Sequence, residues 1–242
     1  GREALRTMLA TYDVLFEQFR PGVLARLGLD PRELRQEFPR LIICSLTGYG
    51  QTGPLRDRAG HDVNYLARAG VLGAQGPAGA PPALLGAQLA DVSGGMWSVI
   101  AILAALRQRD QTGEGAWLDI AMSEGTIPFA TTSFAAALAG QPGERGNETL
   151  TGGIAPYQIY ATKDRRAVTV AALEPKFWMR LCAEFGLEAE AFETLENQAI
   201  LQFPVMALFD AFAGLLVDTP DGPDLLYGVD AHAPGVLLHQ GG

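Results

Sequence analysis

The sequence predicts an α/β protein, in which part of a parallel sheet with its covering helices is followed by a smaller α+β unit. Two observations lead to this fold class. Helical and strand patterns alternate over residues 1–50, which is typical of a parallel α/β layer. After residue 150 the pattern changes to two alternating strands around a polar turn, which indicates a hairpin followed by a helix.

Local signals justify each element of the first fifty residues. Residues 3–11 predict an amphipathic helix, and residues 13–16 predict a short strand. A further helix is expected after Pro21, and Asp30 is well placed to cap a helix over residues 31–38. The apolar run LIICSL, residues 41–46, then predicts a buried strand of the parallel layer.

Helices are expected over most of the next hundred residues. The glycine- and proline-rich loop 48–60 leads into the helical pattern GHDVNYLARAGVLGA, and residues 76–86 form a linker without periodicity. A long helix is expected from about Asp91 to Arg109, and another over roughly 121–139. The hairpin strands YQIYAT and AVTVAAL flank the turn KDRR, and the helix EPKFWMRLCAEFGL follows. We therefore divide the chain into a large-domain portion, 1–149, and a small α+β domain, 150–242.

Composition narrows the classes of function. The net charge of −9 argues against a nucleic-acid partner, because phosphate backbones require clustered Lys and Arg. No segment reaches the roughly 18 uncharged apolar residues of a membrane span, since the run that begins at Gly94 turns basic after Leu106. Cys44 and Cys182 form no C-x-x-C pair and lie in apolar surroundings, so we expect reduced thiols and a cytoplasmic protein.

Gly48, Gly50 and Gly53 have the spacing G-x-G-x-x-G of a dinucleotide-binding loop. That fingerprint also requires a helix at the third glycine and an acidic residue ≈ 20 positions later. Here Pro54 follows Gly53 at once, and the sequence around residue 70, ARAGVLGA, contains no acid. We therefore interpret the glycines as a tight loop that carries the chain from the preceding strand to His61.

Three residues are candidates for chemistry. His61 follows the glycine loop, near the strand ends where α/β layers bind ligands. Asp91 precedes a long apolar helix, and Glu174 precedes a helix that begins with proline, so either carboxylate could simply cap its helix. No metal-binding motif and no G-x-S-x-G elbow is present. One histidine with one or two carboxylates suits proton transfer, or attack by a carboxylate on an activated acyl group.

Several long motifs together resemble the family III CoA-transferase family (CaiB/BaiF, the carnitine-dehydratase and bile-acid-inducible group), and most closely its α-methylacyl-CoA racemase branch. They are FEQFRPGVLARLGLDP, PRLIICSLTGYGQTGPLRDRAGHDVNY, ILAALRQRDQTGEGAWLDIAM and GGIAPYQIYATKD, in the family's order. The resemblance covers residues 1–185 and continues faintly to DAHAPGVLL. It implies a partial Rossmann-like sheet, a smaller α+β domain and an interlocked homodimer, and it makes the chain look truncated at both ends.

The resemblance also implies roles for individual residues. Asp91 matches the carboxylate that the transferases use as a nucleophile, and the racemases pair this aspartate with a histidine that matches His61. Asp62 would support Asp91, and Glu174 would pair with His61. Apart from the resemblance, an enolate oxygen needs hydrogen-bond donors, and we expect backbone N–H groups near the start of the Asp91 helix to supply them. Because His61 and Asp91 are both present, we expect a racemase of 2-methylacyl-CoA thioesters. A CoA-transferase and an inactive remnant are the alternatives.

Coenzyme A would be bound as part of an acyl-CoA substrate, so no separate cofactor and no metal is expected. Arginines suit its phosphates because the guanidinium group offers two parallel donors. The positions that match the family's CoA-binding residues are Gln18, Phe19, Arg20, Arg26, Gly60, His61, Asp62, Val63, Asn64 and Tyr65.

Overall fold

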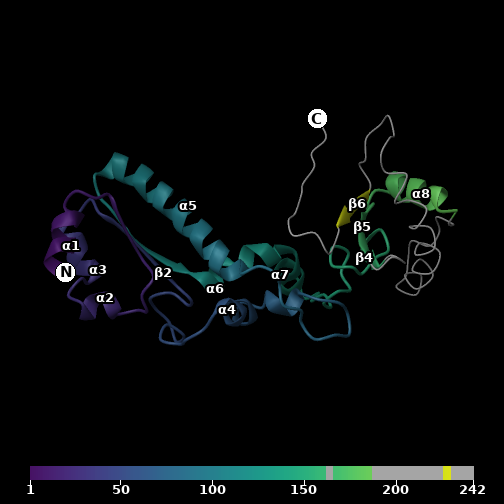
Figure 1. The fold of residues 1–242 in the computed structure, drawn as a ribbon, viewed down its shortest axis with the longest axis horizontal. Coiled ribbons are helices and arrows are strands. Elements are labelled where there is room, and N and C mark those ends of the chain that lie inside the picture. The colour runs from purple at the N-terminus through teal and green to yellow at the C-terminus, as the bar shows by residue number, and fades with distance from the viewer. Residues whose placement is uncertain (162–165, 187–225, 230–242) are drawn as a thin grey trace. The chain divides into compact units, whose positions relative to one another are not determined.

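A computed structural model describes residues 1–161, 166–186 and 226–229, which fall into two compact units (Figure 1). The first unit comprises Gly1–Gly76 and Pro81–Pro142, and the second comprises Pro77–Ala80 and the described residues from Gly143 onwards. Residues 163–165 of the predicted KDRR turn and the DAHAPGVLL segment lie outside the described residues.

The first unit is built on a three-stranded parallel sheet, which confirms the predicted α/β layer. Its order is β1 (Val14–Glu17), β2 (Ile42–Thr47) and β3 (Trp117–Ala121). Every residue of the central strand β2 is buried, because both of its faces are covered. Ile43 packs with Leu24 and Leu34 on one face, while the thiol of Cys44 is hydrogen-bonded to Ser98 of helix α5 on the other.

Strand β3 is the main element that the sequence analysis missed. Residues 116–120 received no assignment, yet β3 pairs with β2 so that Leu118 lies opposite Cys44. The helix expected over 121–139 is also wrong as a single element. It is divided into α6 (Met122–Gly125), a 3₁₀ turn (Ile127–Ala130) and α7 (Thr131–Leu138). Pro128 explains the break, since a proline lacks the N–H of a helical bond and its ring clashes with the carbonyl four residues earlier.

Helix α5 (Leu89–Thr112) runs along the sheet and packs on β2 and β3 (Figure 1). It begins two residues earlier than expected, so Asp91 lies in its first turn and not at the cap. Close packing needs small residues: a Cβ on Gly94 would stand 2.9 Å from Leu46 Cδ1. At the other end, Arg109 Nη1 lies 2.9 Å from Asp13 Oδ1.

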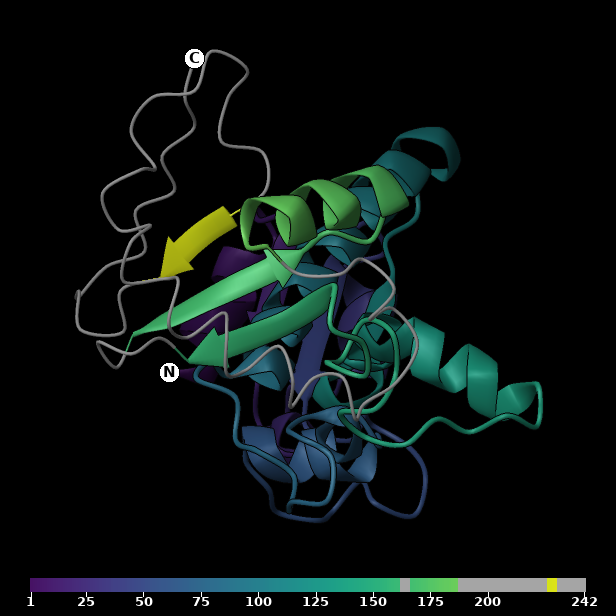
Figure 2. The ribbon, with the colours of Figure 1, turned by 90° about the vertical axis from the view of Figure 1, so that its right-hand side faces the viewer.

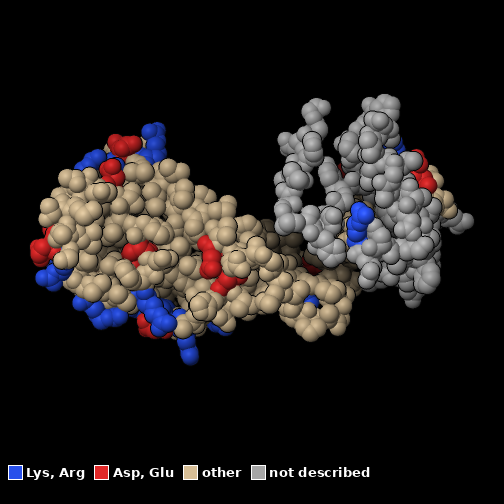
Figure 3. Space-filling view, viewed as in Figure 1, with Lys and Arg blue, Asp and Glu red and all other residues tan. Residues whose placement is uncertain are grey.

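The outer face of α5 is apolar and exposed. Val92, Met96, Val99 and Leu103 are each more than half exposed, and the surface along the helix is uncharged between its ends (Figure 3). By length and composition alone α5 could cross a membrane, because an 18-residue window of it has a mean hydropathy of 1.7, although no uncharged run of that length is present. This is weak evidence, because the core helix of an α/β layer passes the same test.

Four shorter helices also belong to the first unit. They are α1 (Arg2–Leu9), α2 (Val23–Arg26), α3 (Pro31–Glu37) and α4 (Asp62–Arg68). Asp30 caps α3 as predicted, with Oδ1 accepting from Arg32 N at 2.8 Å. The helix predicted from residue 60 to 74 is interrupted at Gly70, whose φ of 82° ends α4 before a 3₁₀ turn (Leu72–Ala74).

The second unit contains the predicted hairpin. Strand β4 (Tyr157–Ala161) is antiparallel to β5 (Ala167–Ala171), and a further antiparallel strand, β6 (Leu226–Val229), pairs with β5. Helix α8 (Pro175–Glu184) packs against the sheet (Figure 2), with Trp178 and Leu181 in one apolar core with Tyr160 and Val168.

We predict that Gly115→Ala destabilises the first unit by about 2 kcal/mol or more. A Cβ at this position, just before β3, would overlap the carbonyl of Leu41 and stand 2.6 Å from its carbon, and a backbone group cannot move aside cheaply. The matched control is Gly95→Ala in α5, where the added methyl meets nothing within 4 Å and helix propensity should add about 1 kcal/mol. Urea denaturation of both variants tests this, and equal stabilities would contradict it.

Candidate functional site

The loop after β2 is shaped by its glycines in two different ways. Gly50 and Gly53 have φ values of 83° and 81°, a left-handed conformation that permits sharp turns. Gly48 is needed for space instead, since a Cβ there would stand 2.5 Å from Cζ of Tyr65. Turns, and no helix, follow Gly53, so the chain lacks the helix N-terminus that a dinucleotide fingerprint requires.

Tyr65 holds the loop at both ends. Its hydroxyl donates to the carbonyl oxygen of Gly60 at 2.6 Å, and its ring lies so close that a Cβ on Gly60 would stand 2.7 Å from Cε1. The ring also meets Tyr49 edge to face, with centroids 5.1 Å apart. Only 9% of Tyr65 is exposed. The ring therefore fixes the backbone that leads into His61.

The loop has a second anchor in strand β3. The backbone N–H of Gln51 is 3.0 Å from each carboxylate oxygen of Asp119. The sequence analysis missed Asp119 because it missed the strand. A weak signal was available in the short, mostly apolar WLDIA segment, which comes after Gly115 and a helix, as a strand in a β-α-β pattern does.

His61 is the N-cap residue of α4. Its backbone N–H donates to Asn64 Oδ1 at 3.0 Å, and its carbonyl accepts from Asn64 N at 2.8 Å. Both residues are exposed, as is Val63. Asn64, expected to contact CoA, therefore has a structural function as well: it fixes the turn that presents the imidazole.

Asp62 joins α4 to α5. Its Oδ1 accepts from the backbone N–H of Ala90 at 2.6 Å and of Asp91 at 3.1 Å, so it caps α5 from another helix. The N–H of Leu89 is taken by the carbonyl of Ala87. These bonds correct the expectation that N–H groups near Asp91 could stabilise an enolate, because the donors of this first turn are already used.

The carboxyl of Asp91 has a raised pKa. Partial burial is the main cause, the negative charge of Asp62 adds to it, and nearby His61 opposes it. A helix N-terminus ordinarily stabilises a carboxylate. Here Asp62 already accepts from the N–H of Asp91, which weakens that stabilisation. The raised pKa makes Asp91 easier to protonate than an ordinary aspartate, and a carboxyl beside a histidine is a pair that can donate and accept protons.

The predicted CoA-binding residues of the first unit lie near the carboxyl ends of β1 and β2, where open α/β sheets bind ligands. Gln18, Phe19 and Arg20 follow β1 and are exposed. The charges of Asp91 and Arg20 both affect the pKa of the Tyr65 hydroxyl. Burial raises the pKa of Tyr65 most, Tyr49 and Asp91 raise it further, and Arg20 lowers it. Arg20 and Asp91 thus both lie near Tyr65.

Two further predicted residues belong to other elements. Arg26 lies on α2, where its Nη1 is 3.6 Å from the position of a Cβ on Gly22. Glu174 is the N-cap residue of α8 in the second unit, where it is exposed and makes no side-chain capping bond. Its pairing with His61 stays a prediction. Within the described residues, no group of three or more His, Cys, Asp or Glu could hold a metal ion.

The first unit is an α/β domain with a parallel sheet, and His61, Asp62 and Asp91 lie at the starts of its helices α4 and α5. The chain belongs to CoA-transferase family III, because the sequence pattern of that family matches residues 1–212. This confirms the family that the motifs indicated.

Individual relatives support the same assignment. α-Methylacyl-CoA racemase of Mus musculus is 40% identical over 194 residues, which are 78% of this chain and 50% of the relative. Succinyl-CoA:glutarate CoA-transferase of Mus musculus is 34% identical over 177 residues, covering 73% and 41%. A CAIB/BAIF family protein from Brucella suis has a crystal structure with a TM-score of 0.70 and 30% identity, covering 87% and 57%. The chain spans about half the length of these curated relatives.

We predict that Asp62→Asn lowers the pKa of Asp91 while leaving the fold intact. The amide oxygen can still accept from Ala90 and Asp91, but the negative charge that raises the pKa is gone. Asp62→Ala also removes the acceptor and should cost about 1 kcal/mol of stability. NMR titration of the Asp91 carboxyl carbon and thermal melting measure the two effects. An unchanged pKa in Asp62→Asn would show that burial alone perturbs Asp91.

We predict that Gly60→Ala disturbs the loop far more than Tyr65→Phe does. The added methyl would overlap the Tyr65 ring, whereas phenylalanine keeps the ring and loses only the bond to Gly60. The costs should be about 1–3 kcal/mol for the overlap and about 1 kcal/mol for the lost hydrogen bond. Chemical denaturation measures both. The expected order would be reversed if the hydroxyl, and not the ring, determined the loop conformation.

Proposed function

We propose that the protein is a racemase that interconverts (R)- and (S)-2-methylacyl-CoA thioesters by removing the proton of C2 from one face and adding a proton to the other. The observation that carries this proposal is that Asp62, the residue after His61, accepts from Asp91 N at 3.1 Å, which brings His61 near an Asp91 carboxyl whose pKa is raised. The family membership and the similarity to α-methylacyl-CoA racemases support it.

The mechanism needs two groups on opposite faces of C2. Neutral His61 takes the C2 proton from one enantiomer, and the electron pair of the C–H bond moves onto the thioester oxygen as an enolate. Protonated Asp91 then gives its proton to the other face of C2, and the thioester carbonyl re-forms. The reverse reaction exchanges the roles. Each correctly placed group can contribute about 10²–10⁴-fold to the rate.

The surroundings of Asp91 suit this role. An ordinary aspartate has a pKa of about 3.9 and is a poor proton donor at neutral pH. Burial and the adjacent charge of Asp62 raise that pKa, which increases the protonated fraction. The N–H donors of the first turn of α5 are occupied, so the enolate oxygen requires donors from other parts of the protein or its partner.

A CoA-transferase is the second candidate. Asp91 is exposed at the start of α5, and transferases are among the relatives. In this reaction the Asp91 carboxylate attacks the acyl-CoA carbonyl and displaces the CoA thiolate. The thiolate then attacks the resulting anhydride to form an aspartyl-CoA thioester and release the acid. Hydroxylamine trapping of that thioester would favour this candidate.

We also propose that the protein acts as a cytoplasmic homodimer, as the family resemblance implies. In such a dimer Glu174 of one subunit would orient His61 of its partner and select its tautomer. Analytical ultracentrifugation of the full chain tests the dimer. A folded monomer that fails to bind CoA would identify an inactive remnant.

We predict hydrogen–deuterium exchange at C2 of a 2-methylacyl-CoA incubated with the protein in D₂O and followed by NMR. His61→Ala and Asp91→Asn should each reduce exchange by about 10²–10⁴-fold. The two variants should show this loss when the reactions start from opposite pure enantiomers, because each group removes the proton of one enantiomer. The control is Asp57→Asn, which removes an exposed acid of the same loop and should change nothing. Equal exchange in His61→Ala and the parent would overturn the two-base mechanism, and CoA binding without exchange would favour the transferase.

A further inference from the structure

The peptide unit between Gly60 and His61 is hydrogen-bonded to helix α4 through both of its polar groups. Its carbonyl oxygen accepts from the Tyr65 hydroxyl at 2.6 Å, and its N–H donates to Asn64 Oδ1 at 3.0 Å. The carbonyl and the N–H of a trans peptide point in opposite directions within one plane. Two consecutive residues of α4 therefore hold opposite edges of this plane.

The peptide unit after His61 is held by the same two residues. The His61 carbonyl accepts from the backbone N–H of Asn64 at 2.8 Å and of Tyr65 at 3.2 Å. Only two soft dihedral angles separate neighbouring peptide planes, and those of His61 are a φ of −129° and a ψ of 176°. Because the planes on both sides are fixed, the direction of the Cα–Cβ bond that carries the imidazole is fixed too.

The Tyr65 hydroxyl is held in place by the packing of its ring. The ring is buried, lies against Gly48 and Gly60, and meets Tyr49 edge to face. Packing of the ring places the loop, whereas the hydroxyl and Asn64 set the orientation of one peptide within it. Tyr65→Phe therefore removes the second effect and keeps the first.

Asn64 makes its bond without adding a charge. The capping box ordinarily places Glu or Gln at the third helical position, and a carboxylate is favoured at a helix N-terminus. Here Asp62 and Asp91 already bring two carboxyl groups close to His61. A third would stabilise the protonated imidazole, and the proposed reaction needs a neutral imidazole to remove the C2 proton. An uncharged acceptor therefore suits both the helix and the reaction.

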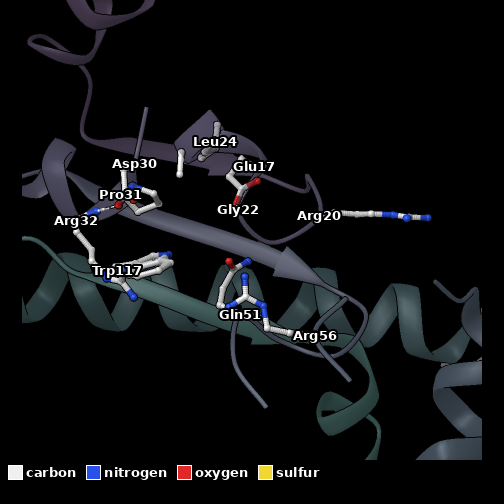
Figure 4. Close-up of a pocket in the computed structure, with 11 residues that line it drawn as sticks. Glu17, Arg20, Gly22, Leu24, Asp30, Pro31, Arg32, Gln51, Arg56 and Trp117 are labelled. Carbon is white, nitrogen blue, oxygen red and sulfur yellow. Dashed lines mark hydrogen bonds between the residues drawn. The ribbon is translucent and has the colours of Figure 1, made fainter. Parts of the chain in front are cut away.

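A cleft in the first unit has a volume of about 240 Å³, and neither Asn64 nor Tyr65 lines it. Its walls come partly from the loops after β1 and β2, where the predicted CoA-binding residue Arg20 is joined by Gln51 and Arg56 (Figure 4). In the part of the chain that the structure describes, none of the lining residues belongs to α4. The contacts of Asn64 and Tyr65 thus point to His61 and not to a ligand in this cleft.

We propose that Asn64 and Tyr65 are positioning residues that orient His61 through the peptide unit before it, and that neither acts by binding coenzyme A. The proposal rests on the proposed function, because it takes His61 as a base at C2. It differs from the expectation, drawn from the family resemblance, that both residues contact CoA. Displacing a reacting group by about 1 Å can cost about 10²-fold in rate, so a small rotation of this peptide is enough to slow the reaction.

Proton exchange at C2 of a 2-methylacyl-CoA in D₂O, measured over a range of substrate concentrations, tests the proposal. Asn64→Ala and Tyr65→Phe should each lower kcat by about 10- to 100-fold and leave KM close to that of the parent. The double variant should lose little more than either single one, because the two bonds hold the same peptide. The control Arg68→Gln changes an exposed residue in the last turn of α4 and should match the parent.

Asn64→Asp separates the orientation of His61 from a general effect on stability. The variant keeps an oxygen that accepts from the His61 N–H, so kcat at its optimal pH should return towards the parent value. The added negative charge favours the protonated forms of His61 and Asp91, so the pH optimum of exchange should move to higher pH. A variant as slow at every pH as Asn64→Ala would contradict a function through this bond.

The exchange of the His61 backbone N–H with D₂O, followed by NMR, tests the two bonds without substrate. Tyr65→Phe should speed this exchange as Asn64→Ala does, although the Tyr65 hydroxyl bonds to the other edge of the peptide. An unchanged rate in Tyr65→Phe would overturn the proposal, as would single-variant losses in kcat that multiply in the double variant. A raised KM with unchanged kcat would return both residues to CoA binding.

Circular dichroism of each variant separates lost orientation from lost folding. A parent that exchanges no C2 proton would refute the racemase. The N–H exchange of His61 then decides alone whether Asn64 and Tyr65 hold the peptide together, because that measurement needs no substrate.

Discussion

One carboxylate oxygen holds the candidate site together. Asp62 Oδ1 accepts from the first turn of α5 at Ala90 and Asp91, although 28 and 29 residues separate the partners. This bond fixes α4 against α5, and it brings a second negative charge beside Asp91. Stability and reactivity therefore depend on the same contact. Removing it would loosen a helix terminus and at once change the proton affinity of the acid that the proposed reaction uses.

The loop that leads to the histidine is positioned by packing more than by hydrogen bonds. Gly48 and Gly60 leave room for the Tyr65 ring, and the ring fills the space that two side chains would otherwise occupy. The resulting contact fixes both ends of the loop between β2 and α4. The dinucleotide-like spacing is therefore a consequence of one aromatic side chain and two left-handed turns, and it carries no information about a nucleotide.

Local signals predicted what is local in this molecule: the α/β alternation, the Asp30 cap and the β4–β5 hairpin. These local signals failed where contacts between distant parts of the chain determine the structure. Strand β3 is only five residues long and is stabilised by pairing with β2, so its own sequence gave a weak signal. The hydrogen bonds from Asp62 to α5 span 28 residues and have no local pattern at all. For the candidate site, the residue pattern indicated His61 and Asp91 and the family motifs implied their roles, but the structure was needed to show how they are held.

The regular geometry of α5 restricts how this chain can change length. Asp91 lies three residues before Gly94, whose missing side chain lets the helix touch Leu46 of the sheet. One residue inserted between them would rotate the acid by about 100° around the helix axis and shift it by about 1.5 Å. The same insertion in the irregular stretch 75–87 would leave that angle unchanged. Natural insertions and deletions should therefore collect in the stretch before the helix and be absent from its first turns.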